Sequence, residues 1–157
     1  MKNSSTPVLS LVFALFSFIS SAQNQTIPLN EPDYNRPRLF QNLPDNIVVS
    51  MTNINSLLNL EVGRAVNINL SATSQFQFQG DVVSIATDND NGIRSVVVRS
   101  TNFPGARLSI SKISNPDGTI SYKGRIISFQ HGDMFDLQSQ NGQFVLVKRN
   151  FYDIVNE

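Results

Sequence analysis

Turn-forming sequences recur about every ten residues through the second half of the chain, and this spacing limits the folds that the chain can adopt. The turns are expected at residues 90–92, 102–105, 115–118, 131–133 and 141–142. Asn91-Gly92 and Asn141-Gly142 suit tight hairpins, because both residue types accept the positive φ angles that such turns need. Short runs that alternate apolar and polar residues lie between the turns, a pattern typical of an antiparallel meander.

The alternating runs predict about seven strands in the segment that follows Gly63. Apolar residues occupy every second position at 66, 68 and 70, at 108 and 110, and at 120 and 122. The alternation shifts at Val82-Val83, which predicts a β-bulge near Gly80-Asp81. We therefore expect a mostly β fold, in which the antiparallel meander forms a curled sheet, a small barrel or a sandwich.

One short helix is expected before the meander, which makes the fold α+β with a single helix. Residues 47–49 could form a short strand, and Thr52 follows in a position suited to an N-cap. Helical spacing then places Ile54, Leu57 and Leu58 on one face, and Gly63 provides a C-terminal stop. The helix is predicted near residues 52–62 of a single β-rich domain that covers residues 39–157.

The first 22 residues have the layout of a secretory signal peptide. Lys2 precedes an apolar run from Val8 to Ile19, and small residues follow at positions 20–22. This run is shorter than the roughly 20 apolar residues that span a bilayer, and no later segment is apolar enough to do so. Residues 23–38 contain three prolines among polar residues and are expected to form an extended linker.

The composition narrows the expected location and partners. The chain has no cysteine, which favours a bacterial envelope or secreted protein over a disulfide-rich one and excludes lipid attachment through cysteine. We therefore expect a periplasmic or secreted protein that is not a lipoprotein. The 12 basic and 12 acidic residues balance, so the overall charge gives no attraction to nucleic acid.

No catalytic or metal-binding constellation is visible in the sequence. His131 is the only histidine, and its place in a Gly-Asp turn favours a conformational role over that of a catalytic base. The run Asp88–Gly92 resembles a calcium loop only poorly, because Gly is fifth rather than sixth and Arg99 stands at the twelfth position. Nothing in the sequence around Asp133 and Asp136 marks either one as a catalytic carboxylate. We expect no enzyme activity, no cofactor and no metal.

The charge of the chain is unevenly distributed. Residues 94–149 contain eight basic and three acidic residues, a net charge of +5, although the whole chain is neutral. A hairpin that pairs Ile110 with Tyr122 would place Arg107 opposite Arg125, and Ser109 opposite Lys123, on the outer face. Like charges directly across a ladder destabilise it. Their presence here is explained either by an anionic partner that these side chains bind or by long side chains that extend into solvent.

These observations lead to one functional hypothesis with two alternatives. We expect an exported, non-enzymatic binding domain that presents a basic β-sheet face to an acidic protein or another anionic component of the envelope. Its candidate partner-binding residues are Arg107, Lys123 and Arg125, with Phe103 as an aromatic at a loop tip. The alternatives are a small-ligand carrier with a barrel cavity, or an inhibitor or folding assistant of an exported enzyme. In the carrier, the cavity would be lined by Phe76, Phe78, Ile85, Ile126 and Phe144.

Overall fold

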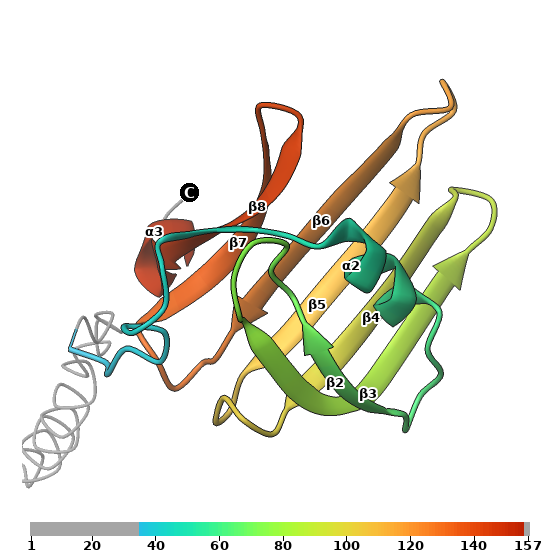
Figure 1. The fold of residues 1–157 in the computed structure, drawn as a ribbon. Helices are drawn as coiled ribbons and strands as arrows, with labels where there is room; N and C mark the ends of the chain where they lie inside the picture. The colour runs from blue at the N-terminus through green and yellow to red at the C-terminus, as the bar shows by residue number, and fades with distance from the viewer. Residues whose placement is uncertain (1–34, 156–157) are drawn as a thin grey trace, which may run out of the picture. The chain divides into compact units, whose positions relative to one another are not determined.

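A computed structural model describes residues 35–155, with side chains through Asp153, and shows one curled antiparallel sheet with two helices (Figure 1). The order of the strands across the sheet is β1-β8-β7-β6-β5-β4-β3-β2. The strands from β2 to β8 therefore form an uninterrupted meander, and β1 is added beside β8. The strands are β1 (Asn46–Val48), β2 (Ala65–Asn69), β3 (Gln77–Asp88), β4 (Ile93–Ser100), β5 (Arg107–Ser114), β6 (Ile120–Ile127), β7 (Asp133–Gln140) and β8 (Gln143–Asn150).

The predicted mostly β meander is confirmed, with seven strands after Gly63 and β1 as an eighth before the helix. The sheet curls into a half-barrel, and its two edge strands meet at one corner. There the amide of Ser50 donates to the Leu70 carbonyl at 2.9 Å, and the amide of Ala72 donates to the Val48 carbonyl at 2.8 Å. The curl gives the sheet a concave inner face, which encloses the core.

Phenylalanine rings fill the centre of the concave face. Phe40, Phe76, Phe78 and Phe135 are each at most 2 % exposed, and Phe103 packs against the first three of them. Every second residue of the central strands contributes an aliphatic side chain to the same cluster, as the sequence alternation predicts. These are Val96, Val98, Leu108, Ile110 and Ile126.

Helix α2 (Met51–Leu58) lies over the concave face, in front of β4 and β5 in Figure 1, and is shorter than predicted. Its N-cap is Ser50, whose hydroxyl accepts from the Asn53 amide, so the expected cap at Thr52 is wrong by two residues. The helix ends at the C-cap Asn59, not near Gly63. Gly63 has a φ of +85° and belongs to the turn that leads into β2.

Two details of the predicted strands require correction. In the β5–β6 hairpin, Ile110 pairs with Gly124 and not with Tyr122, because the connecting loop covers residues 115–119 instead of 114–118. The expected pair of Arg107 with Arg125 is therefore absent, and Arg125 lies opposite Ser109. The β-bulge in β3 lies between Val82 and Ser84, slightly beyond its predicted position.

A second short helix, α3 (Phe151–Val155), follows β8 and was not predicted. It lies beside the start of the described chain, since the Arg36 guanidinium is 5.7 Å from the centre of the Phe151 ring. Arg36 also donates to the Phe129 carbonyl at 2.6 Å, and the Gly132 amide donates to the Pro37 carbonyl at 3.0 Å. The chain thus contacts the domain from residue 36 onward. The predicted signal peptide and most of the predicted linker lie outside the described residues.

Candidate functional site: a basic face beside an open seam

Strands β6 and β7 are paired only near one end. The pairs are Arg125 with Asp136, Ile126 with Phe135, and Ile127 with Met134. Beyond Arg125 and Asp136 the two strands separate, so residues 120–124 of β6 do not pair with residues 137–140 of β7. We call this opening the seam. Figure 1 shows it as the divergence between the β5–β6 and β7–β8 hairpins, whose turns stand highest in that view.

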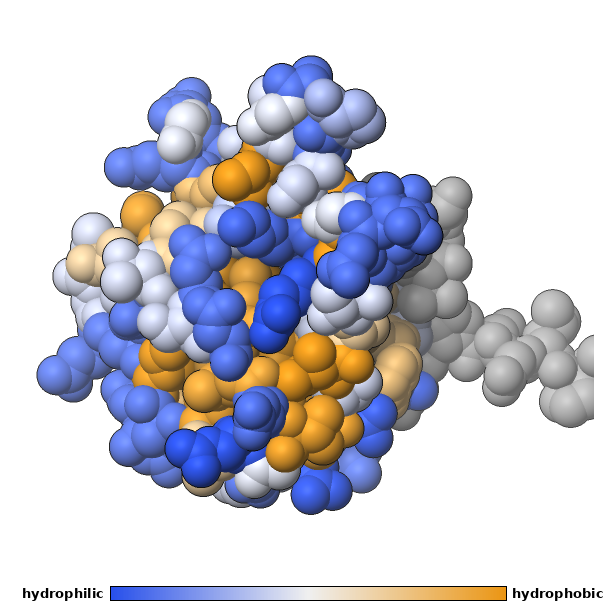
Figure 2. All heavy atoms as spheres, turned by 90° about the vertical axis from the view of Figure 1, so that its right-hand side faces the viewer, coloured by the Kyte–Doolittle hydropathy of each residue, from blue (hydrophilic) through white to orange (hydrophobic). Residues whose placement is uncertain are grey.

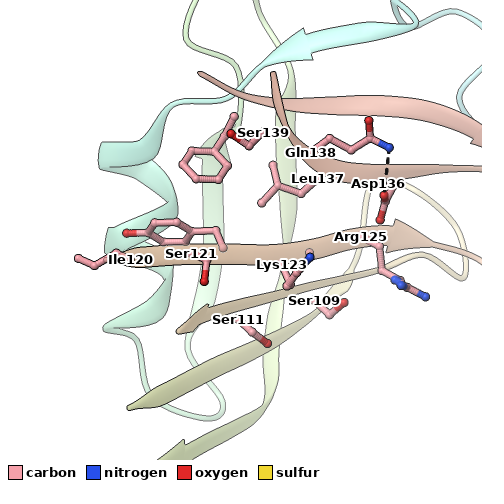
Figure 3. A pocket seen from close by; sticks show the side chains of 13 residues that line it. Ser109, Ser111, Ile120, Ser121, Lys123, Arg125, Asp136, Leu137, Gln138 and Ser139 are labelled. Atoms are coloured by element: carbon pink, nitrogen blue, oxygen red, sulfur yellow. Dashed lines mark hydrogen bonds between the residues drawn. The ribbon is translucent and has the colours of Figure 1, made fainter. Parts of the chain in front are cut away.

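The seam contains a hollow of about 800 Å³ (Figure 3). Its inner side is apolar, where the rings of Tyr122 and Phe144 meet edge to face at 5.2 Å beside the buried Leu137. The Tyr122 hydroxyl donates to the Asn55 side chain of α2 at 2.8 Å, which fixes the ring over the core. Ile120, at the lip of the hollow, is 51 % exposed.

A second view shows the same opening from the side. In Figure 2, two polar lobes stand at the top, at the height of the two hairpin turns that are highest in Figure 1. Apolar atoms are visible between and below these lobes. The residues that line the hollow give it polar sides and an apolar floor formed by Tyr122, Leu137 and Phe144.

The outer, convex face of β4–β6 is basic. Arg99, Arg107, Lys123 and Arg125 alternate with residues that face the core and are all exposed. We call these four side chains the basic face. Arg99 is directly opposite Arg107, and Arg125 lies diagonally from Arg107, next to Ser109.

No member of the basic face forms an ion pair within residues 35–155. The single ion pair there joins Lys148 to Asp45 at 3.1 Å, on the other side of the sheet. Carboxylates border the basic face at both ends, because Asp81 is the β3 partner of Arg99 and Asp136 is the β7 partner of Arg125. The Asp136 carboxylate instead accepts a long hydrogen bond, 3.4 Å, from the Gln138 side chain (Figure 3).

The structure brings three of the four predicted binding residues together. Arg107, Lys123 and Arg125 share the outer face of neighbouring strands. Phe103 belongs to a different part of the molecule, because its ring contacts the core rings of Phe40, Phe76 and Phe78 at centroid distances of 5.4–6.0 Å. Phe103 therefore serves the core and does not extend the basic face.

The residues weighed as catalytic groups are held in local structural contacts. Asp133 is 1 % exposed, and its two carboxylate oxygens accept from the backbone amides of Leu39 and Phe40 at 2.7 and 2.9 Å. His131 Nδ1 is 2.8 Å from the hydroxyl of Ser128, which is fully buried. These contacts tie the β6–β7 turn together and anchor the segment before β1.

The loop that resembled a calcium site forms a hairpin turn. The Asp88 carboxylate accepts from the amides of Asp90 and Asn91, both at 3.1 Å, and from the Asn91 side chain at 2.7 Å. The Asn91 side-chain donor, more than any other contact, holds the pKa of Asp88 below its ordinary value. No group of three or more acidic, histidine or cysteine side chains suited to a metal ion occurs in the described part of the chain.

Three of the five residues expected to line a carrier cavity belong to the interior of the core, and a fourth, Ile85, is partly buried against it. Phe76, Phe78 and Ile126 are each at most 2 % exposed, and Ile85 packs against the same cluster. Only Phe144 reaches the hollow, where it lines the floor of the seam.

Sequence reasoning missed Arg99 and the seam. Folding the hairpin around the predicted turn at 102–105 would have placed Arg99 opposite Leu108, one position from Arg107, whereas the structure pairs Arg99 with Arg107 directly, each four residues from Phe103. The seam offers no comparable sequence pattern, since the polar end of β7, Gln138-Ser139-Gln140, is equally typical of a strand that runs into a turn.

Comparisons with known proteins add no assignment. No protein-family model matches the chain, and neither a curated protein nor a solved structure shows significant similarity to it. Among the described residues, no helix has the length and apolar character that crossing a membrane requires.

Proposed function

We propose that this protein is an exported, non-enzymatic binding domain that holds an acidic partner on its basic face. The observation that carries the proposal is the clustering of Arg99, Arg107, Lys123 and Arg125 on adjacent strands, without an ion pair within residues 35–155. Cations arranged in this way attract an anionic surface and orient it during encounter. The export of the protein rests on the signal-peptide pattern of its first 22 residues.

The position of the arginines supports a binding role. Arg99 and Arg107 form a non-hydrogen-bonded pair, the kind in which side chains approach most closely, because the flanking Ser100 amide donates to the Ala106 carbonyl. Such a like-charged pair destabilises a ladder. Lysine and arginine on edge strands prevent edge pairing, but β4 and β5 are interior strands. An anionic partner would neutralise this repulsion.

Charge reversal on the basic face tests the proposal. The triple variant Arg107→Glu, Lys123→Glu, Arg125→Glu should fold like the wild type, because all three side chains are exposed. It should no longer retain partners from the envelope and culture-fluid fractions of the native host that the wild type retains at low salt and releases at high salt. Retention is measured by mass spectrometry of the captured proteins, and folding by circular dichroism.

A matched control distinguishes the effect of the basic face on partner retention from the effect of the net charge. Arg38, Arg64 and Arg149 are also exposed, and their reversal to Glu changes the net charge equally at other sites. This control should keep the salt-sensitive partner. Equal retention by both triple variants, or equal loss in both, would refute a role for the basic face.

A further inference from the structure

We propose that the seam between β6 and β7 receives an extended peptide strand of the partner, in which apolar and acidic side chains alternate. This inference rests on the proposed function for the acidic character of the partner. Its own basis is the backbone of the two separated strands. Within residues 35–155, backbone groups on both sides of the hollow have no partner strand. Strand edges of this kind are templates for the addition of another strand.

The orientation of the β6 backbone follows from the β5–β6 hairpin. The Asn115 amide donates to the Thr119 carbonyl at 2.8 Å, and opposed residues in an antiparallel ladder alternate between bonded and non-bonded pairs. Ser121, Lys123 and Arg125 therefore direct their amides and carbonyls toward β5. Ile120 and Tyr122 direct theirs toward β7, and there they meet the open seam.

The same reasoning orients β7. Asn141 and Gly142 have φ angles of 50° and 77°, as in a tight two-residue hairpin turn, so Gln140 and Gln143 form the first bonded pair of the β7–β8 ladder. Gln138 then bonds to β8, and Ser139 directs its amide and carbonyl toward β6. The register between Ile126 and Phe135 would place Ser139 opposite Tyr122, but the strands have separated at that point.

The two sides of the seam specify the side chains of the occupant. Alternate residues of an added strand point in opposite directions. Those that point inward meet the rings of Tyr122 and Phe144 and the side chain of Leu137. Those that point outward lie beside Lys123 and Arg125 of β6, with Asp136 and Gln138 of β7 opposite, so that the two cations outnumber the one carboxylate. An apolar residue is favoured at the first set of positions and an acidic residue at the second.

The dimensions suit a short strand. Residues 120–124 extend over about 16 Å at the usual rise per residue of a strand. The hollow of about 800 Å³ is lined by every residue of this segment (Figure 3). A chain of five to seven residues, roughly the usual length of a strand, spans this segment.

Binding of synthetic peptides tests the inference on the full-length protein. The first probe is a capped heptapeptide that alternates valine and glutamate, and the second has the same side chains but N-methyl groups on alternate amides. The first should bind and shift the amide NMR signals of Tyr122 and Ser139. The second should bind at least about fivefold more weakly, since each lost hydrogen bond costs about 1 kcal/mol. A third peptide replaces glutamate by glutamine.

A pair of variants at one position provides the matched control. Ser139→Pro removes the amide that faces the seam without removing a β7–β8 hydrogen bond, whereas Ser139→Ala removes only the side chain. The proline variant should lose affinity for the first peptide by about fivefold or more, and the alanine variant should bind like the wild type. Thermal unfolding of both variants establishes that each is folded before its affinity is measured.

The outcomes distinguish failure of the strand-addition inference at the seam from failure of the proposed function of the basic face. Strand addition is overturned if the first peptide does not bind. It is also overturned if the N-methylated peptide binds the wild type as tightly as the first peptide does, and the Ser139→Pro variant binds the first peptide as tightly as the wild type does. The proposed function stands in either case. If the glutamine peptide binds as tightly as the glutamate peptide but still requires the Ser139 amide, the seam accepts strands and the acidic partner is refuted.

Discussion

Asp133 combines two properties of a catalytic carboxylate, burial and a position beside the only histidine of the chain. Its contacts instead make it an anchor, because both oxygens accept backbone amides from residues 39 and 40. We expect Asp133→Ala to lower the free energy of unfolding by about 3 kcal/mol, since hydrogen bonds to charged groups are the stronger ones and two amides lose their acceptor. Urea unfolding measures this loss.

His131→Ala serves as the comparison for Asp133→Ala. It removes one side-chain contact, with the Ser128 hydroxyl, and should cost about 1 kcal/mol. A loss for Asp133→Ala no larger than that of His131→Ala would show that the carboxylate does not anchor the segment before β1.

Arg107 is expected to be unfavourable for folding and favourable for binding. Its replacement by glutamine relieves the repulsion with Arg99 across the β4–β5 ladder, so Arg107→Gln should raise the free energy of unfolding by about 0.3 kcal/mol. The same change should weaken retention of the acidic partner. Arg64→Gln, at an exposed position before β2, should change neither quantity. A destabilised Arg107→Gln variant would contradict the account of this pair.

At the scale of the elements, the turns of two hairpins are expected to lose stability as the pH falls. The pKa of Asp88 is lowered mainly by the Asn91 side-chain amide, and that of Asp117 mainly by the Thr119 hydroxyl. A carboxyl with a lower pKa in the folded state stabilises the fold above its unfolded value, about 3.8, and loses this contribution as the pH falls. Both carboxylates are exposed, so the effect is small and local.

The double variant Asp88→Asn, Asp117→Asn tests this acid response. Between about pH 4 and pH 2 the free energy of unfolding should fall less steeply in the variant than in the wild type, since two of the titrating groups are gone. Chemical unfolding at a series of pH values gives both slopes. A steeper fall in the variant would contradict the assigned direction.

The turns and strands of the meander were predictable from sequence, whereas their register was not. Hairpins form at both Asn-Gly sequences, but only Asn141-Gly142 is a two-residue turn with both φ angles positive, whereas the β3–β4 loop covers residues 89–92 and only Gly92 has a positive φ. The β5–β6 loop contains a Pro-Asp-Gly sequence that allows more than one loop position. Displacing the loop by one residue moved every cross-strand pair by two, which removed the expected pairing of Arg107 with Arg125. The three cations nevertheless remained on one face, because a displacement of two preserves the alternation.

At the scale of the whole molecule, the seam depends on contacts that no local pattern encodes. Phe103 occurs in a turn, and the sequence left open whether it faces solvent or the core. Only the three-dimensional fold brings Phe40, Phe76 and Phe78 against it. Likewise, the ring contact at the floor of the seam joins Tyr122 of β6 to Phe144 of β8, two residues that are 22 positions apart in the sequence. The basic face was therefore partly predictable, and the seam was not.

Native-state hydrogen exchange of the free protein tests the open seam most directly. The amides of Tyr122 and Ser139 face the opening and should exchange rapidly. Their neighbours Lys123 and Gln138 bond to β5 and β8 and should be protected to the level of the surrounding sheet. Alternating fast and slow exchange along both strands is the predicted result. Equal protection of Tyr122 and Lys123, and of Ser139 and Gln138, would show that β6 and β7 are paired along their whole length, and the account of the binding site would be wrong.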